Sequence, residues 1–316
     1  MWLGVDLGTT NSVAYRVPGD VVPSPLGETL TPSVVCVGPS EVLCGGMAEG
    51  GDPKRTFFGF KRTIGRRYKD KKLWGSAVVW PFPVVSPADP NDEPVYPTNL
   101  GGEMINLTPR DLYVHLLRYM LRDVDLKEIE GVVVTVPAHF DTVQRNATRD
   151  AAKRAGLTNV HILNEPTAAA VAFLDSHPEA HGRILVVDVG GGTVDCTLLE
   201  VQQGHAEVLD KAGTSEVGGE IITDRLVARK KAKDRRGVVE KLKKMVSVQQ
   251  EATVDGVRVT REEVEAVAEP VVTAVCDLAA KVGGRNPPPR AIVLCGGTTR
   301  MPALRRRLAE VYPDAV

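Results

Sequence analysis

A glycine-rich turn behind a short apolar strand occurs twice in this chain, and this repeat constrains the fold more than any other feature. The segment Gly4–Ser12 reads GVDLGTTNS, and the segment Val187–Thr197 reads VDVGGGTVDCT. In each copy an apolar strand ends near an aspartate, Asp6 or Asp188, and another β-prone stretch follows the turn. The second copy lies a little more than half the chain beyond the first, so the sequence predicts two similar halves.

The repeated turn has the composition of an anion-binding loop. Glycine lets the backbone bend sharply and approach a ligand closely, and successive N–H groups then form a concave site for an anion. The strand-end aspartates would repel a phosphate unless a hard cation such as Mg²⁺ lies between them. Ordinary hairpin turns explain one copy as well, but not two matching copies that both follow an aspartate. The residues expected to contact phosphate are Gly8, Thr9, Thr10 and Asn11 in the first turn and Gly190, Gly191, Gly192 and Thr193 in the second.

Other common nucleotide-binding loops are missing from the sequence. There is no GxxxxGKS or GxxxxGKT segment and no GxGxxG segment after a predicted strand. These absences argue against P-loop ATPases, Rossmann dehydrogenases and protein kinases.

Apolar strands alternate with amphipathic helices along the chain, which indicates an α/β fold. Three short β-branched runs, Gly131–Val136, Ile184–Val189 and Ala291–Leu294, predict strands that are buried on both faces. We expect a first lobe over residues 1–182 and a second over residues 183–316. The proline-rich stretch Trp80–Asn99 is expected to be a surface excursion, not a separate domain.

Helix and turn boundaries are also marked. Thr108–Asp111 combines a capping threonine, a proline and an acid, which together predict a helix start. Thr260 and Glu263 have the spacing of a capping box for a long helix, which Pro270 should kink or break. The dipeptide Asp255–Gly256 between two short apolar runs predicts a tight hairpin.

The net charge of −1 argues against nucleic acid as the main partner, because phosphate backbones require a strongly basic surface. The one basic run, Arg229–Arg236, fits a solvated helix face better than a nucleic-acid or targeting patch. No apolar run approaches the roughly 20 residues needed to span a bilayer, and no signal peptide is evident before the first strand. We therefore expect a cytoplasmic protein without membrane partners.

The cysteines point to a reducing environment. They are widely spread and form no CxxC pair, so a zinc site is not expected. Two of them lie in apolar runs, where a thiol behaves as a small hydrophobic group. The five are Cys36, Cys44, Cys196, Cys276 and Cys295.

Over nearly the whole chain the sequence resembles the heat-shock protein 70 family, within the wider actin and sugar-kinase superfamily. Six motifs carry the resemblance, in the order that the family has them. Two are the glycine turns already described. The others are Phe60–Arg67 (FKRTIGRR), Val134–Phe140 (VTVPAHF), Leu163–Ala170 (LNEPTAAA) and Val293–Pro302 (VLCGGTTRMP). The resemblance implies the actin-like ATPase fold, with duplicated ribonuclease H-like lobes and a central nucleotide cleft.

The resemblance also implies a catalytic set for ATP hydrolysis. Lys61 would lie by the γ-phosphate, where it orients the attacking water and stabilises charge in the transition state. Glu165, Asp188 and Asp195 would organise Mg²⁺ and water, with Asp195 or Glu165 as proton acceptor. Asp6 and Asp188 would hold the metal through water. Spacing alone would explain Lys61 as a solvated lysine and Glu165 as a favourable acid at a helix start.

Further matched positions imply an adenosine site. Glu240, Lys243, Lys244 and Ser247 would share one helix face and bind adenine and ribose, although a solvated charged stripe would have the same spacing. The opposite wall of the site would be formed by Gly296, Gly297, Thr298 and Arg300, with the Arg300 guanidinium stacked on the base. A glycine-rich loop between the two walls would include Gly218, Gly219 and Glu220. Pro137 and Arg145 match positions that relay nucleotide state in the family.

Three departures from the family pattern limit what can be inferred. The segments between Asp224 and Glu240 and after Ser247 are shorter than usual, so an exchange-factor partner does not carry over. The given sequence ends at Val316, where the family continues into a closing helix and an apolar linker. It includes no peptide-binding domain, so we do not expect it to hold unfolded polypeptide by itself.

The sequence thus predicts a chaperone-type domain that binds ATP with Mg²⁺, hydrolyses it slowly and couples nucleotide state to lobe closure. Its partners would be a co-chaperone or a separate substrate-binding domain. Three alternatives remain open: an ATP sensor or scaffold with negligible hydrolysis, a bacterial actin-like filament protein, and a sugar or acyl kinase.

Overall fold

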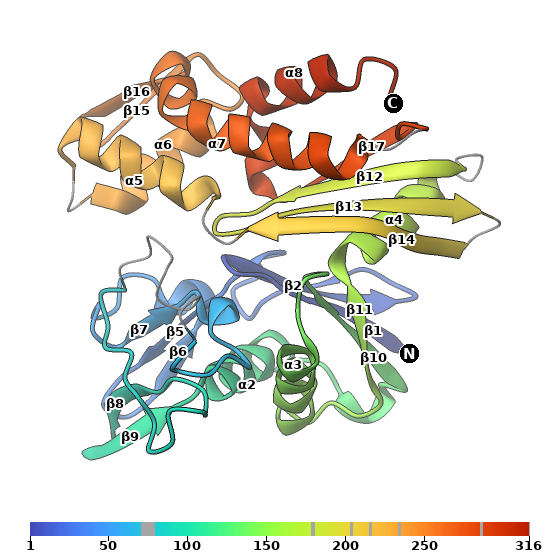
Figure 1. Ribbon diagram of the computed structural model, residues 1–316. Helices are drawn as coiled ribbons and strands as arrows, with labels where there is room; N and C mark the ends of the chain where they lie inside the picture. Colours follow the sequence, from blue (N-terminus) through green and yellow to red (C-terminus); the bar gives the residue numbers. More distant parts are fainter. Residues whose placement is uncertain are drawn as a thin grey trace. The chain divides into compact units, whose positions relative to one another are not determined.

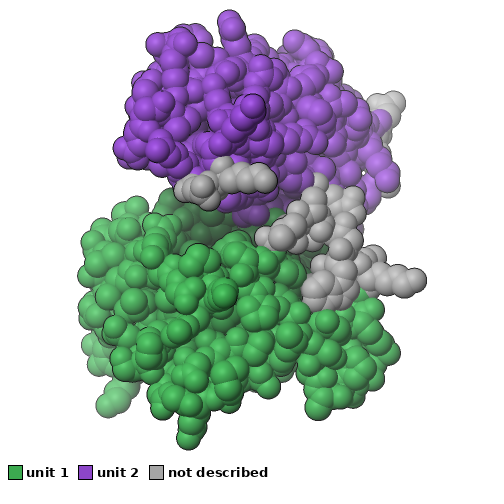
Figure 2. Space-filling view, turned by 90° about the vertical axis from the view of Figure 1, so that its left-hand side faces the viewer, with its two compact units in different colours: residues 1–165 green, residues 166–316 purple. Residues whose placement is uncertain are grey.

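The structure is a computed structural model that describes residues 1–70, 80–177, 181–202, 205–214, 217–232, 235–284 and 287–315. It divides into two compact units, Met1–Glu165 and Pro166–Val316, which Figure 2 shows in different colours. Each unit has its own sheet and its own buried core. The predicted lobe boundary after residue 182 remains a prediction.

The main sheet of the first unit has the order β11-β10-β1-β2-β3, and β4 also pairs with β2. Strands β1, β10 and β11 are parallel, whereas β2 is antiparallel to β1 because the first glycine turn joins these two strands directly. The strands are β1 (Trp2–Leu7), β2 (Asn11–Val17), β3 (Val21–Val22), β4 (Thr31–Pro32), β10 (Gly131–Val136) and β11 (Val160–Asn164).

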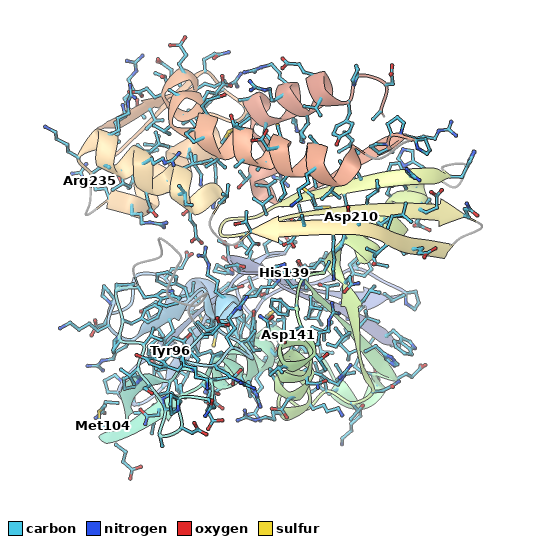
Figure 3. All side chains as sticks on the ribbon, viewed as in Figure 1. Tyr96, Met104, His139, Asp141, Asp210 and Arg235 are labelled. Atoms are coloured by element: carbon cyan, nitrogen blue, oxygen red, sulfur yellow. The ribbon has the colours of Figure 1, made fainter. Side chains whose placement is uncertain are left out.

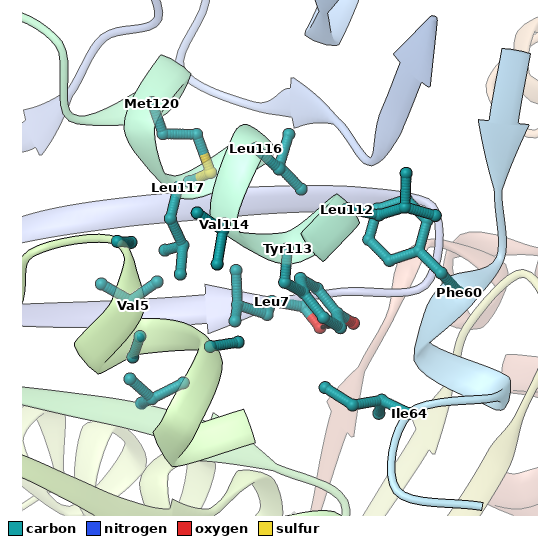
Figure 4. Close-up of a cluster of buried hydrophobic side chains, with 14 of the residues drawn as sticks. Val5, Leu7, Phe60, Ile64, Leu112, Tyr113, Val114, Leu116, Leu117 and Met120 are labelled. Atoms are coloured by element: carbon teal, nitrogen blue, oxygen red, sulfur yellow. Dashed lines mark hydrogen bonds between the residues drawn. The ribbon is translucent and has the colours of Figure 1, made fainter. Parts of the chain in front are cut away.

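Helices α2 (Pro109–Met120) and α3 (Thr142–Arg154) share a buried core with this sheet (Figure 1). Thr108 caps α2 in a reciprocal capping box with Asp111, as the sequence predicts. Alternation along β1 buries Leu3, Val5 and Leu7. Figure 4 shows Val5 and Leu7 among side chains of α2, where they form the core of the unit.

The rest of the first unit consists of short elements that pack on this core. A three-stranded sheet has the order β6-β5-β7, and a hairpin joins β8 to β9. The stretch 80–99 does more than cross the surface, because Phe82 and Tyr96 within it are buried in the core. The elements are β5 (Val34–Val37), β6 (Val42–Cys44), β7 (Thr56–Phe58), β8 (Tyr96–Leu100), β9 (Glu103–Leu107) and the 3-10 helices η1 (Gly45–Ala48), η2 (Phe60–Arg62) and η3 (Leu126–Glu128).

The sheet of the second unit has the order β14-β13-β12-β17 and is covered on both faces. Side chains of β12 alternate: Leu185 and Val187 pack with the core that includes α7 and α8, whereas Ile184 packs with α4. This double coverage agrees with the apolar run predicted for the strand. The elements are α4 (Glu165–Ser176), β12 (Gly182–Val189), β13 (Val194–Gln202), β14 (His205–Thr214), α7 (Arg261–Gly283), β17 (Ala291–Cys295), η5 (Gly297–Arg300) and α8 (Pro302–Val311).

Helices α5 (Gly219–Lys230) and α6 (Arg236–Met245) and the hairpin of β15 (Glu251–Val254) and β16 (Val257–Thr260) complete the unit. Asp255 and Gly256 both have positive φ, 49° and 75°, as the predicted tight turn requires. Thr260 caps α7 with Glu263 as expected. Of the two predicted outcomes for Pro270, a kink or a break, the break is wrong: α7 continues to Gly283, with Val271, Val272 and Val275 buried along it.

The described part of the basic run includes the end of α5 and the start of α6, and two of its charges are paired. Lys230 at the end of α5 binds Glu263 at 2.7 Å, and Arg236 at the start of α6 binds Asp224 at 2.8 Å. Residues 233 and 234 of the run lie outside the described residues. All five cysteine thiols are free, and four are buried. Among the described helices, none is both long and apolar enough to cross a bilayer.

The two sheets repeat one topology. In each, the glycine turn joins an antiparallel pair, β1–β2 or β12–β13, and a third strand continues on the far side. A parallel strand, β10 or β17, then pairs with the first strand of the pair. The repeat in the sequence is therefore a repeat in the fold.

We expect replacement of Leu117 by alanine to lower the free energy of unfolding by about 2–5 kcal/mol, because the fully buried side chain leaves a cavity. The matched change of Met104 to alanine should stay within about 0.5 kcal/mol. Met104 is 71% exposed near the β8–β9 turn (Figure 3). Urea denaturation followed by tryptophan fluorescence tests both, since all three tryptophans precede residue 166. Equal losses in the two variants would contradict this description of the core.

Candidate functional site

Lys61 and Glu165 form a buried ion pair in the first unit. The Lys61 Nζ atom donates to Glu165 Oε1 at 2.6 Å, and the lysine is 9% exposed. Lys61 lies in η2, which follows the left-handed Gly59, and Glu165 begins α4 directly after β11. Burial alone would lower the pKa of Lys61, but the carboxylates of Glu165 and Asp6 raise that pKa overall. The lysine is therefore held as a cation.

Asp6 lies near the end of β1, on the face of the strand opposite Val5 and Leu7. Its Oδ1 atom accepts a hydrogen bond of 2.8 Å from the hydroxyl of Thr135, the residue opposite it on β10. This bond fixes the carboxylate at the strand end beside the first glycine turn. Sequence reasoning missed Thr135, because register between strands is needed to find it.

The first glycine turn is held in place by Ser33. Its hydroxyl donates to the Gly8 carbonyl and its N–H donates to the Thr10 carbonyl, both at 2.8 Å. Gly8 has no room for a side chain, because a Cβ atom would collide with the Asn11 carbonyl oxygen. Within the described part of the chain, the buried Thr10 hydroxyl has no hydrogen-bond partner. A buried hydroxyl without a partner is costly, so a ligand atom here would satisfy it.

The second glycine turn joins two aspartates. Asp188 on β12 lies opposite Asp195 on β13, and the Gly190 N–H closes the turn on the Thr193 carbonyl at 3.0 Å. Asp195 is only 6% exposed. A Cβ atom on Gly213 would lie 2.5 Å from the Asp195 Oδ1 atom. Backbone thus packs tightly against this carboxylate.

Two other predicted segments meet the second turn. The N–H groups of Gly219 and Glu220 donate to the carbonyls of Gly190 and Gly191, at 3.0 and 2.7 Å. The Thr298 hydroxyl also donates to the Gly190 carbonyl, at 2.9 Å. The start of α5 and the turn after β17 are therefore both joined to the second glycine turn.

The close contacts around the second glycine turn leave no room for a side chain at Gly296 or Gly218. A Cβ atom on Gly296 would lie 2.5 Å from Asp188 Oδ1, and one on Gly218 would collide with the Gly191 carbonyl. Gly296 also has a φ of 79°, which favours glycine. Neither position tolerates a larger residue without a shift of the turn.

Lys243 reaches the start of α5 from α6. Its Nζ atom donates to the Gly219 carbonyl and to the Thr223 hydroxyl, both at 2.7 Å. Burial lowers the pKa of Lys243 to about 8, and the charges of Lys244 and Arg236 act in the same direction. The lysine is thus poised to lose its proton slightly above neutral pH. Thr223 is a second partner that sequence reasoning did not find.

The remaining adenosine-site residues are less closely gathered. Glu240 pairs with Lys244 at 3.1 Å and with Arg236 at 3.7 Å, and the Lys244 side chain is 65% exposed. The predicted common helix face does not include Ser247, because α6 ends at Met245 and the chain turns toward β15. Gly297 and Arg300 are exposed in η5.

Arg145 connects the loop after β10 with the end of β11. Its guanidinium donates to the carbonyls of Phe140 and Ala138, at 2.9 and 3.3 Å, and to Asn164 Oδ1 at 2.8 Å. Pro137, the other relay position, is buried in the same loop. Asn164 directly precedes Glu165, so Arg145 supports the backbone that positions this acid.

In the described parts of the chain, no three histidine, cysteine, aspartate or glutamate side chains gather as a metal cluster. The predicted magnesium ligands, Asp6 and Asp188, belong to different units. Their chemistry nevertheless suits the ion, since Mg²⁺ prefers carboxylate oxygens and keeps several waters.

Comparisons with known proteins agree on one family. A family model described as "Hsp70 protein" matches residues 2–254. A "Chaperone protein HscA homolog" of Azotobacter vinelandii is 35% identical, and the match covers 98% of this chain and 54% of that protein. A "Heat shock 70 kDa protein" of Emericella nidulans is 32% identical, with 98% and 54% covered.

A ribosome-associated molecular chaperone of Eremothecium gossypii is 31% identical, with 98% of this chain and 57% of that protein covered. The chain thus spans about half the length of the curated relatives it matches. With two sheets of one topology, each built around a glycine turn, and a family match over most of its length, the chain belongs to the Hsp70 family and has the α/β fold of its actin-like ATPase domain.

Proposed function

We propose that this chain is the ATP-binding domain of an Hsp70-type chaperone and that it hydrolyses ATP slowly. The observation that carries the proposal is the buried pair of Lys61 and Glu165, at 2.6 Å, in the unit that holds the first glycine turn. Burying a lysine is costly, and a paired lysine beside further carboxylates suits a reaction that develops negative charge. The chaperone names of the relatives support the same class.

In this proposal the glycine turns bind the phosphates of one ATP. Their N–H groups and the hydroxyls of Thr9, Thr10 and Thr193 donate to phosphate oxygens. The unpartnered Thr10 hydroxyl, among the described residues, supports this role because a phosphate oxygen would supply its missing acceptor. Lys61 stabilises the charge that develops on the transferred phosphoryl group and orients the attacking water.

The acidic residues have separate roles in this proposal. Glu165 holds the Lys61 ammonium in position, and Glu165 or Asp195 accepts the proton of the attacking water. Asp6 and Asp188 would hold Mg²⁺ through its waters. That ion, when bound, would neutralise charge on the β- and γ-phosphates. The hydrogen bond from Thr135 keeps one Asp6 oxygen fixed and leaves the other for a metal-bound water.

The adenosine end is assigned to the second unit. Gly218 and Gly219 bring the start of α5 to the second phosphate turn, and Lys243 reaches the same place from α6. Glu240, Lys244, Ser247 and Arg300 are proposed to contact adenine and ribose. A co-chaperone or a separate substrate-binding domain would read the nucleotide state.

We expect Lys61→Ala to lower single-turnover ATP hydrolysis by about 100-fold, because a preorganised charge at the transition state is lost. The exposed Lys54 in the same unit supplies the control, and Lys54→Ala should keep the wild-type rate. Quenched-flow or filter assays with excess protein measure both rates. Equal rates in wild type and Lys61→Ala would remove the enzymatic function and leave an ATP sensor.

Replacement of Gly218 by alanine should weaken ATP binding by about tenfold or more, since the new methyl group displaces the second phosphate turn. Gly237 in α6 offers a matched control, because a Cβ atom there meets nothing within 4 Å. Calorimetric titration of both variants measures the affinities. Unchanged affinity in Gly218→Ala would contradict the assignment of this turn.

The affinity for ATP should fall as pH rises through about 8, because Lys243 then loses the proton that gives it its charge. Titrations between about pH 7 and 9.5 test this, with Lys243→Met as the variant. The variant should bind about tenfold more weakly at pH 7 and show little change across this interval. Lys241→Met on the exposed side of α6 should behave as wild type. A Lys243→Met variant that keeps the wild-type pH dependence would refute this role.

A further inference from the structure

The strongest unassigned feature is the segment that supports residues 59–69. Residues 59–69 carry Lys61, and we call them the lysine turn. Residues 90–96, which we call the brace, lie beside the second half of this turn. Two backbone hydrogen bonds join them, from the Tyr68 N–H to the Asp92 carbonyl at 2.9 Å and from the Lys69 N–H to the Pro90 carbonyl at 3.3 Å. The brace belongs to the proline-rich stretch Trp80–Asn99, for which the sequence predicts only a surface excursion.

Two side chains of the brace reach into the lysine turn itself. A carboxylate oxygen of Glu93 accepts a hydrogen bond from the Gly65 N–H. The Tyr96 hydroxyl bonds the Thr63 hydroxyl at 2.6 Å, and both residues are buried. Tyr96 is labelled in Figure 3. The brace therefore contacts the turn close to Lys61 along the chain.

Glu93 also connects the turn to α2 and, through Arg110, to α3. Its side chain is 10% exposed and forms an ion pair of 3.0 Å with Arg110 on α2. Arg110 in turn approaches Asp150 on α3 at 3.5 Å. A buried carboxylate with two partners is held in one geometry, and loss of either partner is costly. The chain of contacts from Gly65 to α3 thus passes through one glutamate.

The lysine turn depends on such external support. Its own hydrogen bonds are local, such as those from Thr63 and Ile64 to the Phe60 carbonyl, at 3.2 and 3.1 Å. Gly65 has a φ of 70°, and a Cβ atom there would lie 2.5 Å from the Cα atom of Gln144. The turn therefore packs closely on α3 at a position where a side chain has no room.

We propose that Glu93 is a positioning residue for Lys61, an assignment that rests on the proposed function of Lys61 in ATP hydrolysis. Glu93 fixes the Gly65 end of the turn against α2 and α3, and the turn then presents the Lys61 ammonium to Glu165. Glu93 contacts neither Lys61 nor the predicted phosphate site in the interactions described, so its effect falls on the hydrolysis step and not on ATP affinity. A misplaced catalytic group lowers the rate without removing the groups that bind.

Three substitutions separate the hydrogen bond from the charge. Glu93→Ala removes both contacts, and Glu93→Asp keeps the charge but is one methylene too short to reach the Gly65 N–H. Glu93→Gln keeps one oxygen acceptor for the Gly65 N–H at the same reach, but it loses the negative charge and turns an NH₂ donor toward Arg110 in place of the second oxygen. We expect the alanine and aspartate variants to lose about tenfold in single-turnover hydrolysis with unchanged ATP affinity. The glutamine variant should recover the part of that loss that comes from the hydrogen bond to Gly65.

Hydrogen exchange supplies a second readout that does not depend on hydrolysis. Peptides covering residues 60–69 should exchange faster in Glu93→Ala and Glu93→Asp than in wild type, whereas Glu93→Gln should resemble wild type. Ser24→Ala is the control for general destabilisation. Ser24 is buried in the same unit and accepts hydrogen bonds from Leu26 and Glu28, away from the lysine turn. This control should neither slow hydrolysis nor change exchange in residues 60–69.

The outcomes distinguish this inference from the proposed function. If wild type hydrolyses ATP and Glu93→Ala does so at the same rate, the positioning role is refuted. A loss of rate matched by an equal loss in Ser24→Ala, or by weaker ATP binding, would also refute it. If wild type does not hydrolyse ATP, the proposed function fails, and exchange alone then decides whether Glu93 braces the turn: faster exchange in Glu93→Ala supports it, and unchanged exchange overturns it.

Discussion

Close backbone approach at the two glycine turns is the constraint on which the rest of the structure depends. A side chain at Gly8 or Gly218 would collide with a backbone carbonyl of the phosphate turn beside it. The turns in turn set the order of strands, because each joins an antiparallel pair that the remaining strands extend. Ser33 fixes the first turn, and the start of α5 fixes the second. Hydrogen bonds to neighbouring segments therefore hold both turns in shape, which would lower the cost of ordering them around the proposed phosphate.

Three charged groups of the first unit, Lys61, Glu165 and Asp6, interact near the end of β1. Lys61 pairs with Glu165, and Asp6 is tied to Thr135. A buried cation that is held between carboxylates keeps its charge and its position, and both properties matter more in a site where water is scarce. Glu93 of the brace adds a further connection, because it pairs with Arg110 on α2, which approaches Asp150 on α3. The geometry of the proposed catalytic residues in this unit is thus supported by several elements that are distant in the sequence.

Much of the fold follows from local sequence signals. The capping boxes at Thr108 and Thr260 and the Asp255–Gly256 turn are predictable because each depends on a few neighbouring residues. Pro270 does not break α7, because tertiary packing of the valines that follow it outweighs one missing hydrogen bond. Contacts such as Lys61–Glu165 join residues far apart along the chain, so spacing alone does not reveal them, and the family resemblance only places both residues in one catalytic set. Ser33, Thr223 and Glu93 lie outside the motifs, and Thr135 lies within one of them without an assigned role. Only their contacts in the structure identify these four residues.

The most direct test of the account is calorimetric titration of the folded chain with ATP and ADP, with and without Mg²⁺. We expect one nucleotide to bind per chain, and ATP to bind more tightly when the metal is present, because the ion would neutralise charge on the phosphates beside Asp6 and Asp188. Circular dichroism of the same sample establishes that it is folded. A folded chain that gives no binding heat with either nucleotide at several temperatures, and no shift of its melting temperature, would contradict the central claim that the glycine turns bind phosphate.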